Sequence, residues 1–265
     1  MKQTSSIKGH WELFKEYVKL NLATALEYRF SFVVQTITMV LNDITWLIFW
    51  WIFFTKFGSL NGWQIEHILV LYALLNLSYG LAGMFFGNKN HISSMISEGR
   101  LDFYINFPKN ILFHVLISRS NWFGVGDALF GLILAAITLS LKQWPLFLLL
   151  TLSSTIIFVS FAVLAHSLAF YFGNSSETSR SLNMGIVTMS SYPSQMFGGV
   201  AKFLMLTVFP AGFISGIPVQ LLYQFNWFWL ISTILFSLMF LATSIYFFYK
   251  GLRKYESGSM ITSRI

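Results

Sequence analysis

The chain has 265 residues, of which 55% are hydrophobic, 18% aromatic and only 10% charged, and its formal net charge is +7. Soluble domains carry about 25% charged residues, and this chain repeats apolar runs long enough to cross a ~30 Å hydrocarbon core as helices. The composition therefore excludes a soluble globular protein and predicts an all-α polytopic membrane protein. The chain contains no cysteine, which excludes disulfides and thiolate metal sites.

The N-terminal region holds five basic residues among its first 29 and no long apolar core, so no cleavable signal peptide is predicted. Within residues 10–29, Trp11, Phe14, Val18 and Leu22 recur at helical spacing, and charged residues occupy the other side. This pattern predicts an interfacial helix lying in the headgroup plane. Such a helix either anchors the topology or acts as a mechanical elbow that passes force into the first span.

Hydropathy predicts six transmembrane helices: Phe30–Phe54, Ile65–Phe86, Trp122–Leu141, Pro145–Phe172, Ser181–Val200 and Phe228–Tyr249. The third could begin nearer Ile111. The fifth is the weakest, because Ser190, Pro193 and Gln195 make it polar.

The basic residues predict the orientation of these spans. With both termini cytoplasmic, 14 of the 17 Lys and Arg residues lie on the inner side, leaving only Lys56, Lys142 and Lys202 outside. This is the asymmetry that the positive-inside rule expects. Topology therefore accounts for the net charge, and a nucleic-acid partner is not expected.

The segment Val200–Tyr223 is apolar, but proline and glycine interrupt it. The interrupting residues are Pro210, Gly212, Gly216 and Pro218. Irregular backbone at membrane depth is tolerated only where protein or a water-filled cavity satisfies its polar groups. We therefore expect a re-entrant pair of short helices that dips back from the outer face. Alternatively, this segment is the true fifth crossing and Leu182–Met196 lies on the inner surface.

Two acidic residues fall inside predicted spans, Asp43 in the first and Asp127 in the third. An intramembrane carboxylate should face protein or water. Either the pair relays protons in an ion-coupled carrier, or it has a structural role, making polar contacts between helices or lining a cavity, and we favour the structural role. His166 in the fourth span is likewise expected to form a hydrogen bond to a neighbouring helix. The chain has no G-x-x-x-x-G-K-[ST] phosphate loop and no clustered metal ligands, so we predict no catalytic residue and no metal site.

A charged, proline-closed segment, SEGRLDFYINFPKN, separates the second and third predicted spans. Just before it, Ile92, Met95 and Ile96 share one side of a short helix that Gly99 is expected to end. The segment is too apolar for a solvated loop and too interrupted for a span. We expect exposed hydrophobic knobs that dock into a groove on a partner protein.

Three stretches of the chain resemble a known family. MISEGRLDFYINFP resembles the I-x-x-G-x-[LI]-D-x-[YL]-[LI]-x-x-P pattern that follows the second span in six-span permease subunits of the ABC-2 exporter superfamily. GLRKYESGS resembles the Y-E-S-G ending of one subgroup whose substrates are unassigned. SYPSQMFGG and FPAGFISGIPVQLL are similar to that subgroup's fifth span and extracellular gate. The order of these motifs extends the resemblance over nearly the whole chain, although Asn106 departs from the family pattern.

The resemblance implies a single transmembrane domain over residues 1–265, with a coupling loop at 88–110 and an outer gate at 200–223. The implied ATPase-docking residues are Ile92, Met95, Ile96, Gly99, Leu101, Asp102, Tyr104 and Pro108. From their positions in the predicted spans and the broken segment, we expect the translocation path or gate to contain Asp43, Asp127, Pro193, Pro210, Gly212, Gly216 and Pro218.

The resemblance also implies the partners of the chain. Two copies of a separate ATPase would hold ATP and Mg²⁺, and a second, similar but distinct permease chain would complete the pore in the lipid bilayer. This chain itself would bind no cofactor. The implied function is export of a hydrophobic or amphipathic substrate across the plasma membrane of a prokaryote. An ion-coupled carrier that uses Asp43 and Asp127 is the main alternative, and a membrane scaffold without transport is another.

Overall fold

The computed structural model describes residues 7–256, which are almost entirely helical. Within that range no strand forms, and the only β-type pairing is an isolated bridge between Leu60 and Trp63. Four helices are long and apolar enough to cross a membrane: α2 (Arg29–Phe57), α3 (Ile65–Phe86), α8 (Trp144–Ser167) and α13 (Trp227–Leu252). α3 continues through η1 (Gly87–His91) into α4 (Ile92–Ser97), and α8 continues into α9 (Ala169–Phe172). The predicted all-α membrane architecture is confirmed.

The third predicted span is shorter than expected. α7 (Phe123–Thr138) has 16 residues, which at 1.5 Å per residue extend over about 24 Å. It does not begin near Ile111, because α6 (Ile111–Ile117) is a separate helix and residues 118–122 between the two are not helical.

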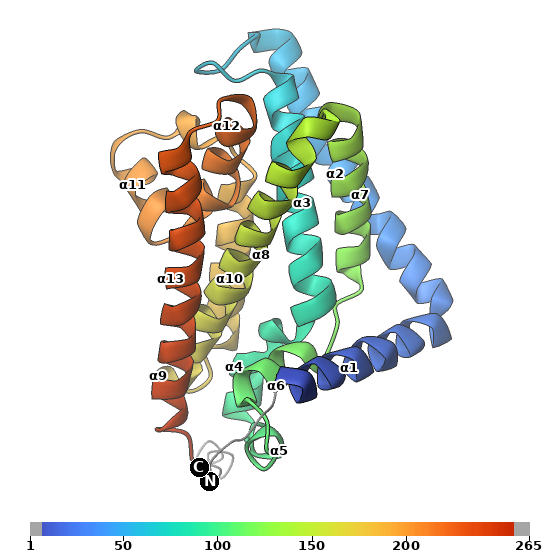
Figure 1. Ribbon diagram of the computed structural model, residues 1–265, viewed down its shortest axis with the longest axis vertical. Helices are drawn as coiled ribbons and strands as arrows, with labels where there is room; N and C mark the ends of the chain where they lie inside the picture. Colours follow the sequence, from blue (N-terminus) through green and yellow to red (C-terminus); the bar gives the residue numbers. More distant parts are fainter. Residues whose placement is uncertain (1–6, 257–265) are drawn as a thin grey trace.

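The fifth predicted span, Ser181–Val200, is wrong in its boundaries, because α10 (Ser176–Ser190) starts earlier and ends ten residues sooner. Ser179 Oγ donates to the Ala165 carbonyl (2.8 Å), near the end of α8. At the other end of α10, Ser215 Oγ donates to the Ser190 carbonyl (2.6 Å). These contacts and Figure 1 place α10 alongside α8, rather than across the end of the bundle as the alternative prediction requires.

After η3 (Ser194–Met196), the chain forms the predicted pair of short helices. α11 (Gly199–Thr207) is followed by the π-helical turn η4 (Gly212–Gly216) and α12 (Ile217–Tyr223), with a bend of 76° between the two halves. Both helices lie near the upper end of the molecule in Figure 1. By length and composition the described chain thus has four spans, or five if the bent pair counts as one, and the predicted number of six is not confirmed.

Backbone contact between α3 and α7 organises the core. A Cβ atom built on Gly80 would lie 2.5 Å from the Gly124 carbonyl oxygen, and one on Gly124 would lie 2.6 Å from the Gly80 carbonyl oxygen. Two turns further along α7, a Cβ on Gly131 would lie 2.5 Å from the Leu77 nitrogen. Small residues allow this close approach, which is typical of helix pairs in membranes. α3 is therefore fixed at the centre, with α8 packed on its other side.

The outer helices expose much of their apolar surface. Only 17% of the most apolar window of α2 and 22% of that of α13 is buried within the chain, as expected for helices that face lipid or another subunit. α1 (Ile7–Glu27) runs across the lower end of the bundle at a steep angle to α2 (Figure 1). This orientation is the one that the predicted interfacial helix requires, although its position relative to a membrane stays a prediction.

Candidate functional site

The predicted knobs are not exposed. Ile92, Met95 and Ile96 on α4 are each at most 5% exposed and belong to the hydrophobic core. α4 packs against α8 and α9, so its apolar face is covered by the chain itself. The prediction that these three side chains project from the surface is therefore wrong. Whether any of them contacts a partner stays untested.

Gly99 ends α4 as predicted. It has φ +73°, a left-handed conformation in which glycine has no Cβ to clash. The Arg100 nitrogen donates to the Met95 carbonyl (2.9 Å) and the Gly99 nitrogen donates to the Ile96 carbonyl (3.4 Å), which together form a Schellman motif. This turn reverses the chain and directs Leu101 back into the core.

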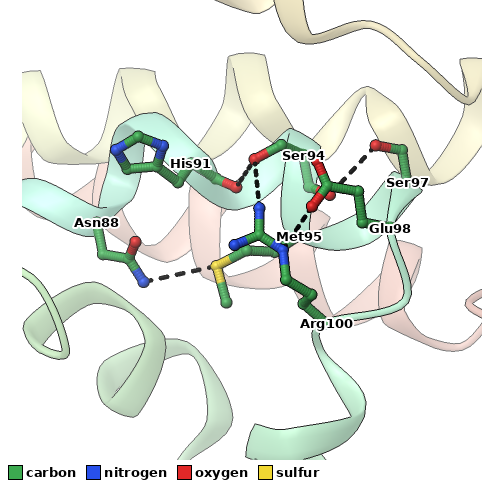
Figure 2. A network of polar contacts seen from close by, with 7 residues as sticks. All are labelled: Asn88, His91, Ser94, Met95, Ser97, Glu98 and Arg100. Atoms are coloured by element: carbon green, nitrogen blue, oxygen red, sulfur yellow. Dashed lines mark hydrogen bonds and ion pairs between the residues drawn. The ribbon is translucent and has the colours of Figure 1, made fainter.

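Polar side chains stabilise the α4 turn on its outer side (Figure 2). Arg100 Nε forms an ion pair with Glu98 (2.6 Å), and its Nη2 donates to Ser94 Oγ (3.3 Å). Ser94 Oγ in turn donates to the His91 carbonyl (2.9 Å). Because Arg100 and Glu98 are about half exposed, we assign the ion pair an orienting role rather than a large contribution to stability.

The exposed apolar residues of this segment are on and after α5 (Asp102–Ile105). Phe103 is 57% exposed, Ile105 39% and Phe107 42%. The Phe103 and Phe107 rings contact each other at 4.9 Å between centroids. We call these three side chains the α5 apolar surface. It lies at the lower end of the molecule in Figure 1, opposite α11 and α12.

Inward-facing residues hold α5 in place. The Tyr104 hydroxyl donates to Ser118 Oγ (2.9 Å). The buried Asn88 amide donates to the same Ser118 oxygen (2.8 Å) and to the Val115 carbonyl (2.9 Å). Thus α5, η1 and the end of α6 are joined through one polar cluster.

Asp102 of the predicted docking motif lies next to Tyr255 of the C-terminal motif. Burial and the adjacent Asp102 carboxylate raise the pKa of Tyr255 to about 12. Two stretches that carried the family resemblance, more than 140 residues apart, therefore lie side by side. Ser257 and Gly258 of the Y-E-S-G ending lie outside the described residues. Pro108, the last residue of the docking motif, is exposed beyond α5.

α1 contacts the segment that follows α5. The Tyr17 hydroxyl and His114 Nε2 are joined by a hydrogen bond of 2.8 Å, and the Asn110 nitrogen donates to His10 Nε2 (3.4 Å). Burial, together with the positive charge of Lys109, lowers the pKa of His114, so the neutral ring that can accept from Tyr17 is favoured. The sequence analysis did not predict this contact between α1 and α6.

The predicted hydrogen bonding of His166 is confirmed. Its Nδ1 and Ser93 Oγ on α4 are joined at 2.7 Å, and its Nε2 and the Asn183 amide on α10 are joined at 2.9 Å. The ring therefore bridges three helices, and both nitrogens are used. This arrangement is structural rather than that of a free base or metal ligand.

Asp43 and Asp127 both face the protein interior, as expected, and each is 5% exposed. They lie on the packed helices α2 and α7 and are close enough to interact electrostatically. Asp43 Oδ2 has no hydrogen-bond partner among residues 7–256. The pair is thus buried and incompletely satisfied, which is unusual for a purely structural contact.

The predicted gate residues are distributed along the broken pair. Pro193 lies in the turn before η3, Pro210 separates α11 from η4, and Pro218 is near the start of α12. Gly216 approaches Ser194, and a Cβ on Gly212 would lie 2.6 Å from Leu206 Cδ2. Ser154 Oγ of α8 donates to the Ile214 carbonyl (2.8 Å). This hydrogen bond satisfies one carbonyl group of the irregular η4 backbone.

Comparison with known proteins identifies one family. The model of a family described as ABC-2 family transporter protein matches residues 40–259, which include the α5 apolar surface, the Asp43–Asp127 pair and the broken helices. Neither the curated proteins nor the solved structures include a match to the chain. Since the matched region covers far more than half of the sequence, the chain belongs to the ABC-2 family of membrane transporter proteins.

Proposed function

We propose that the chain is the permease subunit of an ATP-driven ABC exporter, powered by a separate ATPase that docks on the α5 apolar surface. The exposure of Phe103, Ile105 and Phe107 carries this proposal. Three large apolar side chains on and just after a short, braced helix are the kind of anchor that fills a pocket on a partner protein. The partner would supply the phosphate loop, ATP and Mg²⁺.

In the proposed mechanism, ATP binding brings two ATPase subunits together and pushes on α5. The Tyr104–Ser118–Asn88 cluster would pass that displacement to α3 and α6, and the Tyr17–His114 contact would pass it to α1. This route supports the mechanical-elbow interpretation of α1. A second, similar permease chain would complete the pore. Export of a hydrophobic or amphipathic substrate would end past α11 and α12, with the termini on the cytoplasmic side of a prokaryotic plasma membrane.

A single-cysteine cross-link tests the docking surface, since the chain has no cysteine of its own. Phe107→Cys, labelled with a thiol-reactive photo-cross-linker in native membranes, is expected to yield an adduct containing a phosphate-loop ATPase. Phe203→Cys on α11 is the matched control, because Phe203 is also exposed but lies at the other end of the molecule. Equal ATPase adducts from both positions, or none from Phe107→Cys, would argue against docking on α5.

The buried Asp43–Asp127 pair supports a second candidate, a proton- or ion-coupled carrier. The energy source and the effect of Asp43→Asn together distinguish the two functions, because this substitution removes the titratable carboxyl group with little change in shape. The exporter proposal predicts no transport by this chain alone and transport that depends on ATP and on the ATPase partner. The carrier predicts transport by this chain alone, abolished by Asp43→Asn and preserved by Asn42→Ala, a change at the neighbouring exposed residue. Transport assays in liposomes with ATP or with a proton gradient measure the difference.

A further inference from the structure

A pocket of about 440 Å³ opens near the upper end of the molecule in Figure 1, beside α12 and away from α5. Segments that are distant in the sequence form its walls: the turn between α2 and α3, the start of α3, η3, α12 with the loop after it, and the start of α13. Its volume falls in the range of about 300–1,000 Å³ that is typical of small-molecule sites. No Lys, Arg, Asp or Glu side chain of residues 7–256 lines it. The pocket therefore suits an uncharged ligand.

The turn between α2 and α3 gives the pocket a rigid wall. Leu60 and Trp63 exchange two backbone hydrogen bonds (3.0 and 2.9 Å) around Asn61 and Gly62, whose φ angles are +48° and +83°. Asn-Gly is the preferred sequence for a two-residue turn with left-handed backbone at both positions. The Trp63 side chain is only 3% exposed, and the Asn61 amide donates to the Gln195 carbonyl (3.0 Å). A ligand meets this wall already formed, which lowers the ordering cost of binding.

Carboxamide side chains converge on the pocket from several of these segments. They are Asn61, Gln195, Gln220, Gln224 and Asn226. Among the described residues, the Gln220 and Gln224 side chains form no hydrogen bond. Asn226 uses only its oxygen, which accepts from the Phe228 and Trp229 nitrogens. Each carboxamide contains both a donor and an acceptor, so the pocket offers groups of both kinds without a formal charge.

Aromatic rings form much of the remaining surface. Tyr223 and Trp229 line the pocket and are each 43% exposed. The Tyr223 ring is supported by the His67 ring, with 4.2 Å between centroids. The face of an aromatic ring is partially negative and attracts C–H groups that are slightly positive. A sugar ring presents such C–H groups on its face, and each of its hydroxyl groups both donates and accepts hydrogen bonds.

We propose that this pocket binds a neutral saccharide, which stacks on Tyr223 and Trp229 and forms hydrogen bonds with Gln220 and Gln224. An anionic ligand would find no basic side chain to pair with its charge. A purely apolar ligand would cover the two glutamines without giving them partners, which costs free energy. A saccharide satisfies both the rings and the carboxamides. Only the position of the pocket outside the cell rests on the orientation proposed above, and the binding itself does not depend on an ATPase partner.

The experiment uses the full chain in phospholipid nanodiscs, because glycoside detergents carry sugar headgroups that would compete. A glycan array with neutral and acidic members is screened, and the best neutral oligosaccharide is then titrated. Trp229→Ala is expected to weaken binding by at least about tenfold, which corresponds to about 1.4 kcal/mol. Trp227→Ala is the matched control, because Trp227 is 68% exposed, lies two residues away and does not line the pocket. It should bind as the wild type does.

Gln220→Ala provides a second pocket variant that leaves the aromatic rings in place, and it should weaken binding by about threefold or more. Both substituted side chains are exposed, so the core is unchanged. A glycolipid in the nanodisc that binds when its free glycan does not would identify a membrane-bound headgroup as the source, and binding of the free glycan would identify a soluble one. The proposal is overturned if no neutral glycan binds in either form, if acidic glycans bind more tightly, or if both pocket variants bind as the wild type does.

Discussion

Gly80→Ala is expected to lower the melting temperature of the purified protein by about 2–12 °C. The new methyl group would lie 2.5 Å from the Gly124 carbonyl oxygen and 2.6 Å from the Ala128 nitrogen, and neither backbone atom can move independently. Overpacking of this kind costs about 1–3 kcal/mol, and each kcal/mol shifts the melting temperature of a chain of this size by about 2–4 °C. Thermal unfolding in detergent, followed by circular dichroism, measures the shift.

Gly198→Ala provides the control for Gly80→Ala. A Cβ at Gly198 would meet nothing within 4 Å, and that residue has no left-handed backbone conformation. The control should therefore melt within about one degree of the wild type. Equal melting temperatures for the two variants would contradict the close α3–α7 packing that fixes the centre of the bundle.

The double substitution Phe103→Glu and Phe107→Glu is expected to weaken binding of the ATPase partner by at least about 100-fold. Buried aromatic anchors at interfaces typically contribute 2 kcal/mol or more each, and every 1.4 kcal/mol changes affinity about tenfold. Because both rings are exposed in the free chain, the change leaves the hydrophobic core intact. Titration of the purified permease with the ATPase in detergent gives the affinity.

Phe172→Glu is the matched control for this loss of affinity. Phe172 is also a strongly exposed phenylalanine and ends α9 near the same end of the molecule, outside the α5 apolar surface. Its replacement should leave the affinity within about threefold of wild type. If the control weakens binding as much as the double variant does, general charge repulsion rather than anchoring by α5 accounts for the loss.

Local sequence signals predicted several features correctly. A glycine after an apolar helical turn predicted the reversal at Gly99, and closely spaced prolines and glycines predicted the broken pair. Likewise, a single histidine in an apolar helix predicted the hydrogen-bonded role of His166. Each of these depends on chemistry within a few residues, or on the general requirement that buried polar groups find partners.

The location of the docking surface could not be predicted in this way. The spacing of Ile92, Met95 and Ile96 shows that α4 has one apolar face, but it does not show what covers that face. In the fold, α8 and α9 cover it, and the exposed rings come from α5 instead. The distinction depends on tertiary contacts between segments about 70 residues apart.

The fifth span was misplaced for a related reason. Hydropathy favoured Ser181–Val200, yet the chain leaves the helix after Ser190, at the serine- and proline-containing stretch that leads into η3. Serine side chains offer the backbone alternative hydrogen bonds, and proline cannot continue a helix. The end of α10 is instead joined to η4 by the hydrogen bond from Ser215 Oγ to the Ser190 carbonyl, a contact between distant segments that a hydropathy window does not detect.

The most direct test of the proposed function is isolation of the tagged chain from its native membrane in mild detergent, with mass spectrometry of the proteins that accompany it. The permease proposal predicts recovery of an ATPase that carries a phosphate loop, and its loss when Phe103 and Phe107 are both replaced by glutamate. Recovery of the chain without any ATPase, together with ion-driven transport by the chain alone in liposomes, would contradict the proposal and favour the carrier.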